Sequence, residues 1–252
     1  MTDGPELGIE ALLFDVFGTV VDWRTSVARE LGAFFAPRGV NRDWARVARD
    51  WRALYRPSMQ AVRSGRREFV VLDVLHAENL GQVLDDHGVE APDDAGLDHL
   101  VRAWHRLDPW PDSAEGLRLL GRERPVAALS NGNVALMVAL ARHGGLRWDA
   151  ILGAELARNY KPEPEVYLRS VAALGLEPGA CLMVAAHNDD LRAARALGLR
   201  TAFVARPTEH GPDQATDLRA EEDWDLVADS LVELARALGP ASGLTPGARP
   251  AR

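Results

Sequence analysis

The stretch IEALLFDVFGT, residues 9–19, decides the fold that this sequence predicts. Its first part is a short run of apolar residues, which is typical of a strand buried inside a sheet. Asp15 comes at the end of that run, and Phe17 follows two residues later. An enzyme that handles phosphate would carry a second carboxylate at position 17, so the aromatic ring there needs an explanation.

The residues after this strand fall into two parts with different patterns. Between residues 23 and 106 the apolar residues recur at helical spacing, which predicts about four helices and no strand. From residue 107 onward, short apolar runs alternate with helical stretches, which predicts a parallel sheet with helices on both faces. The predicted fold class is therefore α/β, a Rossmann-like parallel sheet core with a helical cap domain inserted after the first strand.

The same pattern sets the expected domain bounds. Residues 9–22 and 107–239 would form the core, residues 23–106 the cap, and residues 240–252, rich in Pro, Gly and Ala, a flexible tail. In open α/β sheets, ligands bind beyond the carboxyl ends of the strands. A helical insert that leaves from the end of the first strand would therefore cover the site as a lid.

Composition and charge exclude several classes of protein. The 252 residues carry a formal net charge of -8, so no basic stripe is available to neutralise the phosphates of a nucleic acid. No segment reaches the roughly 18 apolar residues of a membrane span, and the acidic N-terminus is no signal peptide, so we expect a cytoplasmic protein without membrane partners. Cys181, the one cysteine, lies in the apolar run CLMV and is expected to pack in the core. Lys161 is the only lysine, and all the other basic residues counted as lysine or arginine are arginines.

Polar side chains collect where the predicted strands end. Taken singly, each of them has a structural interpretation as a turn or cap residue. Because parallel strands bring their carboxyl ends to one edge of the sheet, we expect these side chains to face one pocket. They are Asp15 after the first strand, Ser130 and Asn131 after the second, Lys161 and Tyr167 at the next helix, and His187, Asn188, Asp189 and Asp190.

The order and spacing of these groups resemble the haloacid dehalogenase-like hydrolase superfamily over nearly the whole chain. DVFGTVVD (15–22) resembles its first motif, LSNGN (129–133) its second, YKPEPEVY (160–167) its third, and AAHNDDLRAARALG (185–198) lies where its fourth is expected. Members use the aspartate of the first motif as a covalent nucleophile. Carried over, that role falls on Asp15.

Two departures from the phosphatases of this superfamily point to another reaction. Phosphatases have a second aspartate, the general acid, where this chain has Phe17, and a magnesium-binding carboxylate where it has Ala186. An alanine cannot ligate a hard cation that demands oxygen, and a benzene ring cannot donate a proton. A halide leaves without being protonated, and an apolar residue at position 17 helps to keep water off the reacting carbon. The pattern is similar to the L-2-haloacid dehalogenase family, with no metal and no cofactor.

That resemblance implies a mechanism in two steps. Asp15 would attack carbon 2 of a 2-haloalkanoic acid, and halide would leave toward Arg52, in the cap segment DWRALYRPSM (50–59), and Asn131. Water would then attack the carbonyl carbon of the Asp15 ester and release the 2-hydroxy acid with inverted configuration. The expected catalytic residues are Asp15, Thr19, Ser130, Lys161 and Asp190. Thr19 and Lys161 would hold the Asp15 carboxylate, and Ser130 would bind the carboxylate of the substrate. Asp190 would orient Lys161 and the water. The expected substrate- or halide-binding residues are Phe17, Arg52, Asn131, Tyr167, His187 and Asn188.

His187 lies in a departure from the better-known dehalogenases. They carry Ser-Ser-Asn where this chain has Ala185, Ala186 and His187, so two hydroxyls and an amide become two methyls and an imidazole. Either His187 takes over the positioning of water, or it is a turn imidazole bonded to the backbone. The larger ring would also suit a tight halide pocket and small acids such as fluoroacetate.

Other readings of the sequence stay open at this point. A phosphatase or a phosphonatase of the same superfamily is one alternative, although a Schiff-base phosphonatase needs a cap lysine that is absent here. A non-catalytic binding protein on this fold is another, because fold alone does not prove activity. Tyr55 is expected to be a packing residue, Arg56 a solvated one, and RPTEHGPDQ (206–214) a surface loop that could touch the cap. The expected partners are a small 2-haloacid, halide and, by resemblance, a second copy of the chain.

Overall fold

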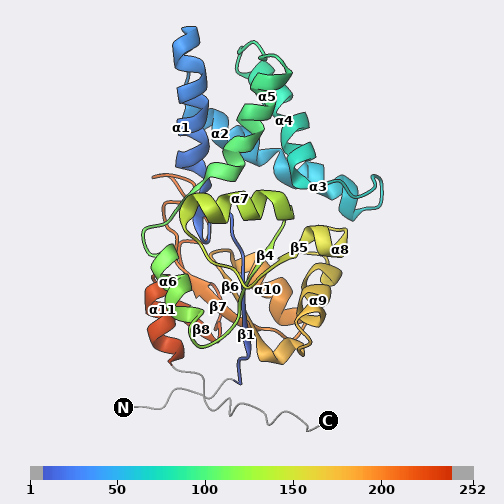
Figure 1. Cartoon of the computed structure of the whole chain (residues 1–252), viewed down its shortest axis with the longest axis vertical. Helices are drawn as coiled ribbons and strands as arrows, with labels where there is room; N and C mark the ends of the chain where they lie inside the picture. Colours follow the sequence, from blue (N-terminus) through green and yellow to red (C-terminus); the bar gives the residue numbers. More distant parts are fainter. Residues whose placement is uncertain (1–7, 240–252) are drawn as a thin grey trace, which may run out of the picture.

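The structure is a computed structural model that describes residues 8–239, with a sheet-containing core below and a helical region above it (Figure 1). Six parallel strands form the main sheet in the order β5-β4-β1-β6-β7-β8. This arrangement confirms the predicted α/β fold class. The strands are β1 (Ala11–Phe14), β4 (Val126–Ser130), β5 (Ala150–Gly153), β6 (Cys181–Ala185), β7 (Arg200–Val204) and β8 (Leu226–Ala228).

Helices cover both faces of this sheet because the central strand is apolar on both sides. In β1, Leu12 and Phe14 pack into one hydrophobic cluster, and Ala11 and Leu13 pack into the other. Cys181 is buried in the second cluster, as expected of a packing residue. The first face is covered by α6 (Ser113–Leu120), α7 (Val134–Gly144) and α11 (Leu231–Leu238), and the second by α9 (Pro164–Ala173) and α10 (Asn188–Ala196), with α8 (Ala154–Ala157) and η3 (Pro178–Ala180) as short connections.

The helical region leaves and rejoins the core through two short strands. β2 (Val21–Asp22) pairs antiparallel with β3 (Asp108–Pro109), so the two connections run side by side at the base of the cap. Within residues 8–239, no helix has the length and apolarity needed to span a membrane. The expected flexible tail lies outside the described residues. The cap contains α1 (Trp23–Phe35), η1 (Ala36–Arg38), α2 (Trp44–Ala53), α3 (Tyr55–Arg63), α4 (Leu72–Asp86), α5 (Asp94–Val101) and η2 (Arg102–Arg106).

The cap has five α-helices because one stretch that reads as a single helix is broken. The apolar spacing predicts one helix over residues 44–62, but α2 ends at Ala53 and α3 begins at Tyr55. Pro57 explains the break, since it has no N–H to donate to the carbonyl four residues earlier. Arg52 therefore lies at the end of α2, not mid-helix, and Arg56 belongs to a different helix.

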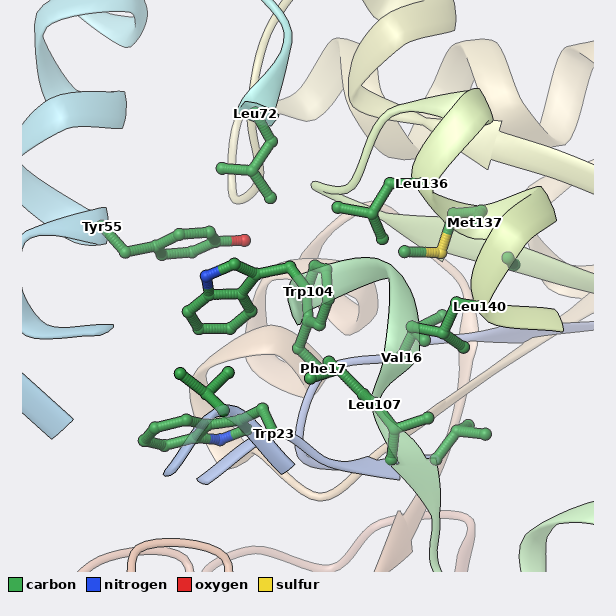
Figure 2. Close-up of a cluster of buried hydrophobic side chains, with 14 of the residues drawn as sticks. Val16, Phe17, Trp23, Tyr55, Leu72, Trp104, Leu107, Leu136, Met137 and Leu140 are labelled. Carbon is green, nitrogen blue, oxygen red and sulfur yellow. The ribbon is translucent and has the colours of Figure 1, made fainter. Parts of the chain in front are cut away.

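An aromatic and aliphatic cluster joins the cap to the core above the ends of the strands. Figure 2 shows Phe17 beside Trp104, with Trp23 and Tyr55 of the cap on one side and Met137 of α7 on the other. The rings of Phe17 and Trp104 meet edge to face, with centroids 5.9 Å apart. The cluster therefore fixes the cap over the edge of the sheet where the polar residues collect.

Candidate active site

A cavity of about 820 Å³ lies between the cap and the carboxyl ends of the strands. The sheet supplies acids and bases to its floor, and the cap supplies aromatic rings and arginines to its roof. From the core come Asp15, Phe17, Asn131, Lys161, Tyr167, His187, Asp190 and Glu209, and from the cap Trp23, Arg52, Tyr55, Arg56 and Arg63, among others.

Asp15, which follows β1, is held by three side chains. Thr19 Oγ1 donates to its Oδ2 over 2.7 Å, Lys161 Nζ donates to its Oδ1 over 2.9 Å, and His187 Nδ1 lies 3.2 Å from Oδ2. Burial alone would raise the pKa of Asp15, but the charge of Lys161 and the contact with His187 outweigh it, so the pKa falls well below its usual range. The carboxylate is therefore ionised and fixed in direction, as a nucleophile requires.

Lys161 is buried between two carboxylates. Its ammonium group donates to Asp15 and also to Asp190, whose other oxygen accepts from the hydroxyl of Tyr167. Its backbone N–H donates to the Asn131 side-chain carbonyl over 2.8 Å, which ties the turn after β4 to the lysine. Burial would lower the pKa of Lys161, but Asp15 and Asp190 raise it, so the residue stays charged. A compact cation fits this position, where a guanidinium fork would be a different shape.

Arg52 presents its charge to the cavity without a carboxylate partner. Its guanidinium carbon lies 3.9 Å from the ring centroid of Tyr55 and 5.7 Å from that of Trp23. Its buried Nε has no hydrogen-bond partner, and among residues 8–239 no acidic group pairs with it within 4.0 Å. Arg56, in contrast, pairs with Asp189 over 2.7 Å. A cation with free N–H groups in an aromatic surrounding is suited to receive an anion.

Phe17 and Ala186, which stand where phosphatases have carboxylates, contribute no oxygen atom from their side chains. The Phe17 ring is buried against Trp104 and faces the cavity. Ala186 is buried, and its backbone N–H donates to Thr19 Oγ1 over 2.9 Å. The ring at position 17 thus belongs to the apolar wall that joins cap and core, which answers the question that the first motif raises.

Three of the expected site residues have other tasks in the structure. Asn188 does not line the cavity, and its side chain bonds to Asp217, Arg219 and Trp224 in the loop before β8. Ser130 is fully buried and does not line the cavity, since its Oγ accepts the N–H of Gly132 and shapes the turn after β4. Tyr167 lines the cavity, but its hydroxyl supports Asp190.

Sequence reasoning missed Glu209 and the cap rings. Glu209 belongs to the loop after β7, yet its side chain is only 1% exposed. Its Oε2 lies 2.9 Å from His187 Nε2, and its Oε1 accepts from Trp23 Nε1 of the cap over 2.8 Å. The loop therefore touches the cap, but this residue is not on the surface. No apolar periodicity or motif marks Glu209, and Tyr55, expected only to pack, also lines the cavity.

Comparison with known proteins places the chain in a family. The family model for haloacid dehalogenase-like hydrolases matches residues 9–198. The chain belongs to the haloacid dehalogenase-like hydrolases.

Within that family, its homologues by sequence and by structure include L-2-haloacid dehalogenases. The (S)-2-haloacid dehalogenase of Xanthobacter autotrophicus is 30% identical over 79% of this chain and 76% of its own length. The structure of the defluorinating L-2-haloacid dehalogenase Rha0230 is 47% identical, with a TM-score of 0.91 over 94% of this chain and 98% of that chain. The Xanthobacter autotrophicus L-2-haloacid dehalogenase with chloropropionic acid covalently bound has a TM-score of 0.76 and 27% identity, over 90% of this chain and 97% of that chain.

Proposed function

We propose that the protein is an L-2-haloacid dehalogenase, which hydrolyses short 2-haloalkanoic acids to 2-hydroxy acids through an ester on Asp15. The observation that carries this proposal is an ionised, buried Asp15 on the floor of a cavity whose roof presents the unpaired guanidinium of Arg52. Displacement of a halide needs these two parts, a nucleophile and a receptor for the departing anion. The homologues described above support the same reaction.

In the first step, Asp15 attacks carbon 2 of the acid from the side opposite the halogen. A new carbon–oxygen bond forms, the carbon–halogen bond breaks, and halide leaves toward Arg52 and Asn131. Thr19 and Lys161 keep the carboxylate aimed, because each donates to one of its oxygens. The covalent chloropropionic acid complex of the Xanthobacter enzyme supports an intermediate of this kind.

In the second step, water attacks the carbonyl carbon of the ester and the 2-hydroxy acid leaves with inverted configuration. Asp190 and Tyr167 hold Lys161 against Asp15 during both steps, since neither oxygen of Asp190 is left without a partner. Phe17 excludes bulk water from the reacting carbon, because its ring faces the cavity from the wall between cap and core.

Magnesium, which the phosphatases of this family use, does not fit the residues present. Lys161 already bridges Asp15, the nucleophile, and Asp190, and Asp189 is paired with Arg56. The side chains of Phe17 and Ala186 have no oxygen to offer a hard cation. The proposed reaction therefore has no step through a metal and needs no cofactor.

The proposed substrates are short acids and include fluoroacetate. The defluorinating relative at 47% identity supports this extension, and so does the imidazole of His187, which fills more of the cavity floor than an amide would. We also propose a homodimer, as the family resemblance implies, which sedimentation equilibrium measures. We propose a cytoplasmic location as well, which cell fractionation tests.

Halide release tests the proposal. We expect chloride or fluoride from chloroacetate, L-2-chloropropionate and fluoroacetate at the same rate with and without chelator, and inverted lactate from L-2-chloropropionate. D-2-chloropropionate is the matched control, because backside attack in a chiral cavity discriminates between enantiomers. Loss of activity in chelator that magnesium restores, or no halide from any of these acids, contradicts the proposal.

A further inference from the structure

The outer part of the cavity contains charged side chains that the proposed reaction does not use. We infer that Arg49 of α2 forms a subsite there for a second carboxylate, and that the protein therefore also dehalogenates 2-halodicarboxylic acids, whose carbon chain ends in another carboxylate. This inference rests on the proposed function, because it extends the substrate class of the same reaction. The outer part consists of lining residues none of which is buried, namely Arg49, Arg56, Asp189, Arg192, Asp217 and Glu221.

The cavity is larger than a short haloacid requires. Its volume of about 820 Å³ is in the range of pockets that enclose drug-sized ligands. In the proposed reaction, a two- or three-carbon acid lies between Asp15 and the guanidinium of Arg52, so it fills only the inner part. The outer part can therefore accommodate a longer chain on carbon 2 of the substrate.

Apart from Arg49, the charged side chains of the outer part already have partners within the protein. The acids among them are matched by arginines or by an amide, so they do not leave an uncompensated negative charge that would repel an anionic substrate. The pairs are Arg56 with Asp189 over 2.7 Å, Arg192 with Glu221 over 2.5 Å, and Asp217 with the amide of Asn188 over 2.8 Å.

Arg49 has no such partner. Its side chain lines the cavity, and within residues 8–239 no hydrogen bond or ion pair holds its guanidinium group. A guanidinium presents its N–H groups as a planar fork that matches a carboxylate. One positive charge balances one carboxylate, whereas a phosphate group would bring nearly two negative charges. The free cation therefore favours a carboxylate as its ligand.

The position of Arg49 on its helix limits the length of the substrate. Arg49 and Arg52 are three residues apart on α2, so they lie on one face with Cβ atoms about 5–6 Å apart. The halide leaves toward Arg52 in the proposed reaction, and the second carboxylate would bind one helical turn away. A spacer of about one to three carbons between carbon 2 and that carboxylate fits this separation. The expected substrates are therefore four- to six-carbon dicarboxylic acids.

The chemistry of these substrates is that of the proposed reaction. Asp15 displaces chloride from carbon 2 of L-2-chlorosuccinate and forms an ester. Water then hydrolyses the ester, and the products are D-malate, chloride and one proton. The second carboxylate takes no part in making or breaking bonds. Arg49 is therefore a binding residue, and its contribution should appear in KM more than in kcat.

Chloride release from a matched pair of acids tests the inference. L-2-chlorosuccinate and its monoamide, with the amide at the end remote from chlorine, have the same number of non-hydrogen atoms, but only the first has a second carboxylate. We expect the wild type to show a kcat/KM about tenfold higher for the dicarboxylic acid, mainly through KM, as one charge-assisted hydrogen bond provides. Arg49→Gln should lower this ratio to about one, because glutamine keeps a polar side chain without the charge.

Arg46→Gln is the matched control. It removes the same charge from the same helix, but Arg46 does not line the cavity, and its Nε lies 3.8 Å from Asp50 Oδ2. This variant should keep the ratio of the wild type. Inhibition gives a second readout that needs no turnover of the longer acids. D-malate should inhibit the hydrolysis of chloroacetate at about tenfold lower concentration than its remote monoamide does, and Arg49→Gln should remove that difference.

The outcomes are distinct. The inference is overturned if the wild type treats acid and amide alike, if Arg49→Gln keeps the ratio, or if chloroacetate releases chloride and neither member of the pair does. An equal loss of the ratio in Arg46→Gln and Arg49→Gln would mean long-range attraction of anions and would also overturn the subsite. If the wild type releases no halide from chloroacetate either, the proposed function itself fails.

Discussion

On the floor of the cavity, the charged side chains nearest to Asp15 have opposite charges within hydrogen-bond distance, whereas on the roof the guanidinium of Arg52 has none. Lys161 lies between Asp15 and Asp190, and His187 lies between Asp15 and Glu209. Arg52 has aromatic rings as its neighbours. Paired charges keep the nucleophile ionised and still, while an unpaired cation has a free side for an incoming or departing anion. The core therefore holds the nucleophile in its ionised form, and the cap offers a cation to the departing halide.

Among substitutions in the floor, we expect the largest loss of turnover from a change at the nucleophile, Asp15. Asp15→Asn removes the attacking oxygen anion but keeps the size of the side chain, so we expect a folded protein whose turnover falls by about 10⁴-fold or more. Circular dichroism checks the fold, and single-turnover reaction of the wild type in heavy-oxygen water checks the route. The label should enter Asp15 first. Label that appears directly in the product, with Asp15 unlabelled, contradicts the covalent mechanism and the division between floor and roof.

Removing the cation of the floor should shift the pH dependence as well as the rate. In Lys161→Met, Asp15 keeps its burial, which raises the pKa, but loses the charge that lowers it. Dehalogenation requires ionised Asp15 and is lost as the pH falls through its pKa, so the acidic limb of the halide burst should move to higher pH. We expect turnover near neutral pH to fall by roughly 10³-fold.

Burst rates across a pH series measure this change. Arg118→Met, which removes a surface cation paired with Glu115, is the control and should leave the profile in place. An acidic limb that stays where the wild type has it would show that Lys161 does not set the ionisation of Asp15.

On the roof, the contrast between two arginines sharpens the comparison. Arg52→Ala removes the unpaired cation, and we expect kcat to fall by at least roughly 10²-fold, the effect of losing one preorganised donor. Arg56→Ala breaks an exposed ion pair with Asp189, for which we expect a change within roughly fivefold. Steady-state kinetics on chloroacetate measures both. Near-normal turnover in Arg52→Ala with an inactive Arg56→Ala would mean that the halide binds to Arg56 of α3 and not to Arg52 of α2.

The sequence predicts the floor of the site better than its roof, for a physical reason. Asp15, Lys161 and Asp190 follow or face strand ends, and parallel strands bring such positions together whatever the details of packing. Asn188 adjoins His187 in the sequence, but the start of α10 turns its side chain toward the loop before β8. Glu209 has no signal of its own, because its burial depends on partners that are distant in the chain.

The roof depends on where helices break and how they pack. Pro57 marks the break between α2 and α3 in the sequence. Because a proline has no N–H for the helix, it predicts that Arg52 and Arg56 belong to different helices. The aromatic surrounding of Arg52 is a different case. Tyr55 and Trp23 have the spacing of ordinary packing residues, and only the fold shows that their rings lie under a guanidinium.

The smallest expected effect concerns His76, which lies inside the cap and does not line the cavity. Its ring stacks on Trp104 with centroids 4.2 Å apart, and neither ring nitrogen has a hydrogen-bond partner within residues 8–239. Burial lowers its pKa from 6.5 to about 3, so the ring is neutral and adds no cation to the cap.

Since the unfolded chain binds a proton near pH 6.5 and the folded chain does not, His76 weakens folding as the pH falls from that value toward 3. Between pH 7 and pH 5, the wild type should lose about 2 kcal/mol more of its unfolding free energy than His76→Phe does. Urea titrations at both pH values measure the difference, and halide release should be unchanged within roughly twofold because the residue does not line the cavity. An equal pH dependence in the two proteins would mean that His76 is charged in the folded cap. An imidazolium would then lie inside the cap, and the contrast between the roof and the paired floor would no longer rest on the arginines alone.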